Sequence, residues 1–105
     1  MVKFNMVNVM SIVKYPPHIA DDLVKFYLSG KASKYPEFVK RVNQWMASDY
    51  EYITYNIYEI PEEKLYEGMK GITKRLSAFA SAFEGYEFKV HLLVPGSEAL
   101  ELFKK

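Results

Sequence analysis

The sequence contains no cysteine and only two histidines. The first absence excludes disulfide bonds, cysteine nucleophiles and thiolate metal sites. The histidines lie far apart, with no carboxylate at metal-ligand spacing, so we expect no metal site. Long hydrophobic runs are also missing. The apolar start, Met1–Val13, is too short to span a bilayer and lacks the features of a signal peptide. These absences favour a soluble, cytoplasmic protein.

An excess of charge of one sign is missing as well. Fourteen basic residues against thirteen acidic residues give a net charge of +1. Such a balance lacks the basic footprint of a nucleic-acid-binding protein and the polybasic segment of a membrane-bound one. The phosphate-binding, dinucleotide-binding, zinc-protease and serine-hydrolase motifs are absent too. We therefore predict no nucleic acid, no membrane and no cofactor as a partner.

Aromatic residues, in contrast, are abundant: nine Tyr, seven Phe and one Trp in 105 residues. The length predicts a single domain, residues 1–105, and half of the residues are hydrophobic. A small monomer cannot bury this much aromatic surface in its core. A ligand pocket or a subunit interface would take up the remainder.

Hydrophobic periodicity and turn residues divide the chain into strands and helices. Pro16 and Pro17 stop the first strand, Gly30 and Gly85 follow helices, and Pro61 suits a helix start. Gly68 and Gly71, inside the second helix, indicate close packing. The predicted elements are a strand Val2–Val13 buried on both faces, a helix His18–Leu28, a strand Tyr50–Ile60, a helix Pro61–Phe83, a strand Tyr86–Val94 and a helix Ala99–Phe103.

The segment Glu37–Ser48 is ambiguous. Its apolar residues fit helical spacing slightly better than the alternation of a strand. However, the clearest strand of the chain follows almost at once, and a hairpin through residues 47–49 would give that strand a partner. We therefore predict a strand here, against the local pattern.

The predicted order β-α-β-β-α-β is that of the ferredoxin-like motif, an α+β fold with an antiparallel sheet, here followed by a short C-terminal helix. Both helices would cover one face of the sheet and leave the other face open. That open face would still carry apolar side chains such as Leu93 and several tyrosines. Burial against a second copy of the chain would account for them, so we expect a homodimer.

Two stretches carry a resemblance to a known group of proteins. In YNIYEIPEEKLYEGMKGI a strand leads through PEE into the second helix, and in GYEFKVHLLVPGSEALELFKK a strand runs into a short EAL helix. The chain resembles uncharacterised small dimeric α+β-barrel proteins, whose ferredoxin-like subunits pack sheet to sheet. The resemblance implies a cleft between sheet and helices. Because the group includes oxygenases, isomerases and ligand-sensing domains, it leaves the chemistry open.

His91 is the candidate catalytic residue. It lies centrally in the row Glu87, Lys89 and His91 of the last strand, opposite the row that would face the helices. A neutral imidazole lining a cavity could act as a general base or as a metal ligand. The alternative is a histidine that faces solvent or a subunit interface.

Asn56 is the most unusual residue of the third strand, because asparagine is depleted in strands and its amide needs partners when buried. It shares a face with Tyr52 and Tyr58. The first and third strands would be neighbours, so an Asn–Asn contact to Asn8 or Asn5, or an Asn–Tyr contact, could form across them. Asn56, His91, Tyr52, Tyr58 and Asn8 are therefore the candidate ligand-binding residues, and a polar pair at a dimer interface is the alternative.

Three functions remain open on these grounds. The first is a dimeric domain that binds a small, largely apolar molecule between its helices and sheet. The second is a cofactor-free monooxygenase-like or isomerase-like enzyme with His91 as its base. The third is a purely structural or interaction module. Arg41 and Lys89 could hold an anionic ligand, although isolated cations on strands are more often solvated.

Overall fold

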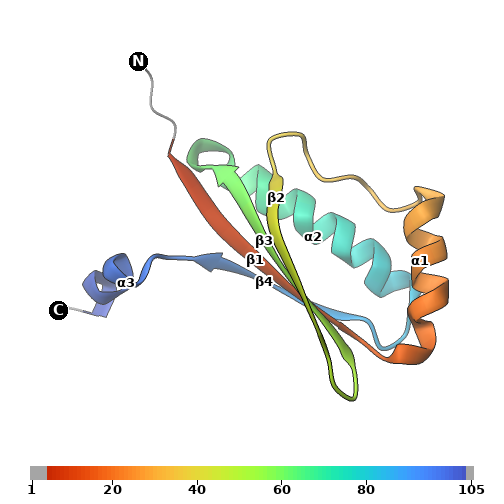
Figure 1. Cartoon of the computed structure of the whole chain (residues 1–105). Helices are drawn as coiled ribbons and strands as arrows, with labels where there is room; N and C mark the ends of the chain where they lie inside the picture. Colours follow the sequence, from red (N-terminus) through yellow and green to blue (C-terminus); the bar gives the residue numbers. More distant parts are fainter. Residues whose placement is uncertain (1–4, 104–105) are drawn as a thin grey trace.

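The computed structural model describes residues 5–103 (Figure 1). The predicted strand residues Val2–Phe4 lie outside this range. The remaining predicted elements are all present, with shifted ends. They are β1 (Met6–Tyr15), η1 (Pro17–Ile19), α1 (Ala20–Ser29), β2 (Lys40–Ser48), β3 (Tyr52–Pro61), η2 (Glu62–Lys64), α2 (Leu65–Ala82), β4 (Glu87–Leu93) and α3 (Gly96–Phe103).

The four strands form one antiparallel sheet in the order β2-β3-β1-β4. Helices α1 and α2 both lie on one side of this sheet (Figure 1). The predicted α+β class and antiparallel sheet are therefore confirmed. None of the helices in the described part of the chain is long and apolar enough to cross a membrane.

The ambiguous segment contains a strand, β2, which pairs with β3 from Lys40 to Ser48. The structure also explains its misleading pattern. The register shifts between Arg41 and Asn43, so Val42 is an extra residue in the ladder. Such a bulge interrupts the two-residue alternation of a strand, which made the apolar spacing look helical.

Strand β1 shows how the two faces of the sheet differ. Val9, Ser11, Val13 and Tyr15 are buried beneath the helices, whereas Lys14 on the other face is exposed. The expectation that this strand is buried on both faces is therefore wrong for a single chain. Within residues 5–103, no helix packs on its second face, although that face is rich in apolar residues.

Helix α2 supplies the centre of the core. Its buried residues Ile72, Leu76 and Phe79 recur at helical spacing and belong to one cluster with Val9 and Ile60 of the sheet. The same helix approaches β3 closely at Gly68. A Cβ built on Gly68 would lie 2.7 Å from Cδ1 of Ile60. The predicted close packing at Gly68 is thus confirmed.

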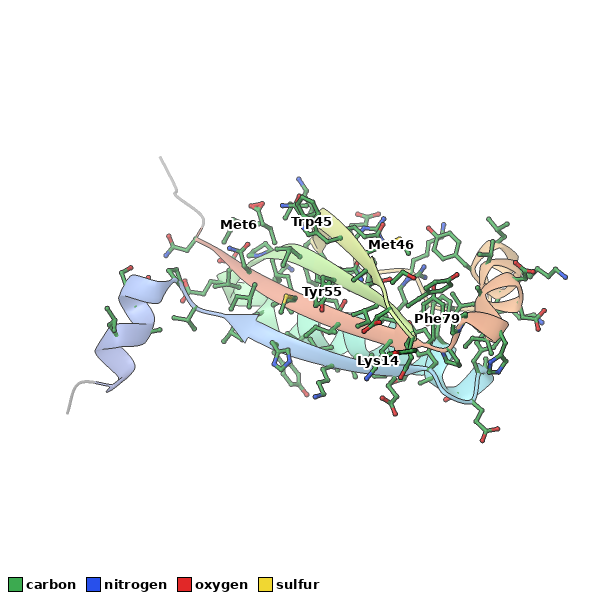
Figure 2. All side chains as sticks on the ribbon, turned by 60° about the horizontal axis from the view of Figure 1, so that its bottom comes forward. Met6, Lys14, Trp45, Met46, Tyr55 and Phe79 are labelled. Carbon is green, nitrogen blue, oxygen red and sulfur yellow. The ribbon has the colours of Figure 1, made fainter. Side chains whose placement is uncertain are left out.

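No described helix covers the other face of the sheet, which Figure 2 views with α2 behind the strands. Trp45 of β2 pairs with Tyr55 of β3 on this face, and Trp45 is 66% exposed. Beyond β4, helix α3 lies away from the sheet (Figure 1). The radius of gyration is accordingly 15.5 Å, whereas a compact chain of this length has about 13 Å.

Candidate functional site

A cavity of about 230 Å³ lies between the helix-covered face of the sheet and helices α1 and α2. Its wall combines apolar side chains, tyrosines, a few amide and hydroxyl groups and two arginines. The lining residues are Val13, Tyr15, Leu23, Val24, Tyr27, Tyr35, Arg41, Gln44, Met46, Thr54, Asn56, Arg75, Leu76, Phe79 and Tyr86.

The cavity exists because α1 packs loosely on the sheet. None of the residues of α1 is buried. Its Phe26 ring makes edge contacts with Phe79 and Phe83 of the α2 region, at centroid distances of 5.1 and 5.6 Å. Leu23 and Val24 of the same helix line the cavity instead of filling it. This architecture provides an apolar space next to a rigid sheet.

The sheet side of the cavity carries a chain of hydrogen bonds across three strands. Gln44 Nε2 donates to Asn56 Oδ1 at 3.0 Å, and Asn56 Nδ2 donates to Ser11 Oγ at 3.1 Å. Ser11 Oγ lies 2.9 Å from the Tyr58 hydroxyl, which lies 2.8 Å from the Tyr35 hydroxyl. Buried polar groups that are paired in this way hold one another in place. The network therefore fixes the direction of the Asn56 amide and the Tyr35 hydroxyl.

Burial keeps three tyrosines of this region neutral. Burial raises the pKa of Tyr58 and of Tyr86 more than any other cause does, and the neighbouring Tyr35 phenol is the second cause. Burial, with Tyr52 as the smaller cause, also raises the pKa of Tyr15. A buried phenol resists ionisation because the phenolate would lose its hydration. The hydroxyls of Tyr15, Tyr58 and Tyr86 therefore remain hydrogen-bond donors well above neutral pH.

The positive charge of the cavity comes from Arg75 of α2 and Arg41 of β2. The Arg75 guanidinium lies 5.0 Å from the ring centroid of Tyr35, 5.4 Å from that of Tyr27 and 5.5 Å from that of Phe79. Its Nη1 also donates to the Ser33 carbonyl at 3.0 Å. Arg41 is exposed and pairs in register with Tyr58. An arginine enclosed by rings keeps a defined position.

Two of the residues proposed from the sequence meet in the hydrogen-bond network. Asn56 and Tyr58 lie on the helix-covered face, and both are buried. Tyr52 shares their face, but its ring makes a T-shaped contact with the Tyr15 ring, at a centroid distance of 5.7 Å, and it does not line the cavity. The expected contact of Asn56 with Asn8 or Asn5 is wrong. Its partner on β1 is Ser11.

His91 and Asn8 lie on the opposite face of the sheet. His91 pairs with Met10, and Asn56 pairs with Ser11, the next residue along β1. Successive residues of a strand point to opposite faces, so His91 and Asn56 cannot share a site within one chain. His91 is exposed there, as is Asn8. An enzyme with His91 as base and Asn56 as orienting group therefore does not fit the geometry of the single chain.

Sequence reasoning missed four residues that define the site: Ser11, Tyr35, Gln44 and Arg75. Ser11 could have been found from its alternation with Val9 and Val13, because a serine on a buried face needs a polar partner. Tyr35 lies in a loop and Gln44 lies next to a bulge. The local patterns of these two residues did not show which face they would take.

Comparisons with known proteins add no assignment to this geometry. No family model matches the chain, and neither a curated protein nor a solved structure is detectably similar to it. The resemblance to dimeric α+β-barrel proteins therefore rests on the order of the elements and on the two quoted stretches. Among the described residues, none form a cluster of three or more side chains suited to hold a metal ion.

Proposed function

We propose that the protein binds a small, largely apolar molecule in the cavity between its sheet and helices, as a ferredoxin-like subunit of a homodimer. The observation that carries the binding proposal is the cavity itself, with a fixed polar row on one side and apolar side chains on the other. Ligand pockets characteristically combine a mostly apolar wall with a few well-placed polar groups. Asn56 and Tyr35 are the polar groups held in place here.

The order of the elements supports the ferredoxin-like assignment. The strand order β2-β3-β1-β4, with α1 and α2 on one face, accompanies the chain order β-α-β-β-α-β. This arrangement places the two middle strands of the sheet, β1 and β3, beneath the helices. Their buried residues form one side of the cavity.

The open face of the sheet supports the homodimer. Apolar residues of β1, β2 and β3 are register neighbours on this face, β4 adds one apolar residue beside Lys89 and His91, and each is at least partly accessible to solvent in the single chain. They are Met10, Ile12, Trp45, Ala47, Ile53, Tyr55, Ile57 and Leu93. Contiguous apolar surface of this kind marks an interaction site. A second copy presents the same surface, so a two-fold contact would bury both.

Closing the cavity from its exposed rim tests the binding proposal. Val24 is 54% exposed and lines the cavity, so Val24→Trp would place an indole at the opening without disturbing the core. The control, Tyr66→Trp, adds an indole at a residue of α2 that is 73% exposed and does not line the cavity. Isothermal titration with small hydrophobic carboxylic acids and their amides should show binding to the native protein and to Tyr66→Trp. Binding to Val24→Trp should be lost. Equal binding by all three proteins would contradict a site in this cavity.

A further inference from the structure

The charged side chains around the cavity are all of one sign. Arg41 and Arg75 line the cavity itself, and both also line an adjoining hollow of about 580 Å³ together with Lys34. Among the described residues that line either space, none is Asp or Glu. The protein as a whole carries almost equal numbers of acidic and basic residues. The cationic lining is therefore a local feature and not a consequence of composition.

Neither arginine forms an ion pair with a carboxylate of the described residues. The ion pairs formed between the described side chains are Lys14–Glu51 and Lys70–Glu67, and neither involves an arginine. Arg75 is partly buried, and its plane contacts three aromatic rings. One of its amino groups donates to the Ser33 carbonyl, which leaves other N–H groups of the guanidinium for a further acceptor.

Solvation by water is the simpler explanation for a cationic side chain on a protein surface, and Lys89, which is exposed on the open face, fits it. Arg75 does not, because its ring contacts and its bond to a backbone carbonyl restrict its movement. A guanidinium that is already held in place loses less side-chain entropy when an anion binds to it. The planar fork of arginine also matches a carboxylate with two parallel hydrogen bonds.

We propose that the ligand is an organic carboxylate with an apolar body. Its carboxylate would be bound by Arg75 and Arg41, and its apolar part would lie between Leu23, Leu76 and the sheet. This inference rests on the proposed function and adds the chemical class of the ligand to it. A primary amide of the same shape offers the two guanidinium groups one carbonyl oxygen and no negative charge, so it should bind more weakly.

Matched pairs of ligands test the proposal on the full chain. Isothermal titration calorimetry at low salt compares four carboxylates with their primary amides: benzoate, 3-phenylpropanoate, hexanoate and decanoate. In each pair that binds, the carboxylate should bind at least about tenfold more tightly than the amide, since hydrogen bonds to charged groups are the stronger ones. Raising the salt concentration should reduce this preference.

Two arginine variants and one matched control assign the preference to residues. Arg41→Gln removes an exposed charge and should reduce the preference for carboxylates without unfolding the protein. Arg75→Gln should abolish it, with the fold checked by circular dichroism because the Arg75 side chain also packs on aromatic rings. Lys74→Gln, at the exposed neighbour of Arg75 that does not line the cavity, should leave the preference unchanged.

The outcomes separate this inference from the proposed function. If amides bind as tightly as carboxylates, the assignment of an anionic ligand is wrong while the binding site stands. The same holds if Lys74→Gln reduces the preference as much as Arg41→Gln does. If neither carboxylates nor amides bind at millimolar concentration, the proposed function fails as well.

Discussion

At the scale of single residues, the site depends on hydroxyl and amide groups that are buried and paired. Asn56 is only 4% exposed, and Ser11 and Tyr58 are fully buried. Among the described side chains, none of the fully buried nitrogen and oxygen atoms lacks a hydrogen-bond partner. A buried group left without its partner costs about 1–3 kcal/mol. The network therefore contributes to stability and to the position of Asn56 at the cavity.

Tyr58→Phe tests this contribution, because it removes the hydroxyl that joins Ser11 to Tyr35. We expect the free energy of unfolding at pH 7 to fall by about 1–3 kcal/mol, measured by urea denaturation. Tyr50→Phe is the matched control, since Tyr50 is 92% exposed. Equal effects of the two substitutions would contradict a structural role of the buried hydroxyl.

The same variant predicts a change in the pH dependence of stability. Burial raises the pKa of Tyr58 in the folded protein, whereas an unperturbed tyrosine has a pKa of about 10. Above that pH the unfolded chain has lost a proton that the folded chain keeps, so stability falls as the pH rises. Without this phenol the decline should be shallower by up to about 1.4 kcal/mol per pH unit. Urea denaturation of native protein, Tyr58→Phe and Tyr50→Phe between pH 9 and 11.5 measures it. An identical decline for Tyr58→Phe and the native protein would contradict the raised pKa.

Residue identity predicted part of the site and could not predict the rest. Asparagine in the middle of a strand correctly marked Asn56 as a buried polar group. Its partner on β1 depends on register, and one residue of slip exchanges Ser11 for a residue on the other face. The alternation of β4 placed His91 on the row opposite the helices. It could not show that Asn56 faces the other way.

At the scale of elements, the sequence was informative wherever turn residues and periodicity agreed. Gly30 and Gly85 have φ of 74° and 91°, a backbone conformation that favours glycine, and each follows a predicted helix. Strand β2 was predicted only from topology, because the bulge at Val42 obscured its alternation. The loose packing of α1, which creates the cavity, depends on tertiary contacts that cannot be predicted from a local sequence pattern.

Gly68→Ala tests the packing of α2 on the sheet. At an unhindered position in a helix, alanine is more stable than glycine by about 1 kcal/mol. At Gly68 the new Cβ would lie within 2.8 Å of two methyl carbons of the fully buried Ile60. We therefore expect a destabilisation of about 1–3 kcal/mol, measured by thermal or urea unfolding.

Gly96→Ala is the control for this substitution, because a Cβ there meets no atom within 4 Å. It should leave stability unchanged or slightly raised. If Gly68→Ala stabilised the protein to the same degree, the close approach of α2 to β3 would be wrong.

At the scale of the whole molecule, the two faces of the sheet have different roles in our account. The helix-covered face holds the cavity, and the open face is proposed to meet a second copy. Trp45→Glu tests the second role, because Trp45 is 66% exposed on the open face and a buried carboxylate there would be costly. Tyr66→Glu is the control at a similarly exposed aromatic residue of α2.

Sedimentation equilibrium measures the outcome. The native protein and Tyr66→Glu should be dimers at micromolar concentration, and Trp45→Glu should dissociate at least about tenfold more readily. A monomeric native protein would contradict the dimer. Equal dissociation of all three proteins would exclude Trp45 from its interface.

Locating the bound ligand is the most direct test of a binding site between the sheet and its helices. In a nuclear magnetic resonance titration of the ¹⁵N-labelled protein with 3-phenylpropanoate and decanoate, we predict that the amide signals of Thr54, Asn56 and Leu76 shift. Those of Lys89 and His91, on the open face, should stay in place. Shifts confined to the open face, or none at millimolar ligand, would contradict a binding site between the sheet and its helices.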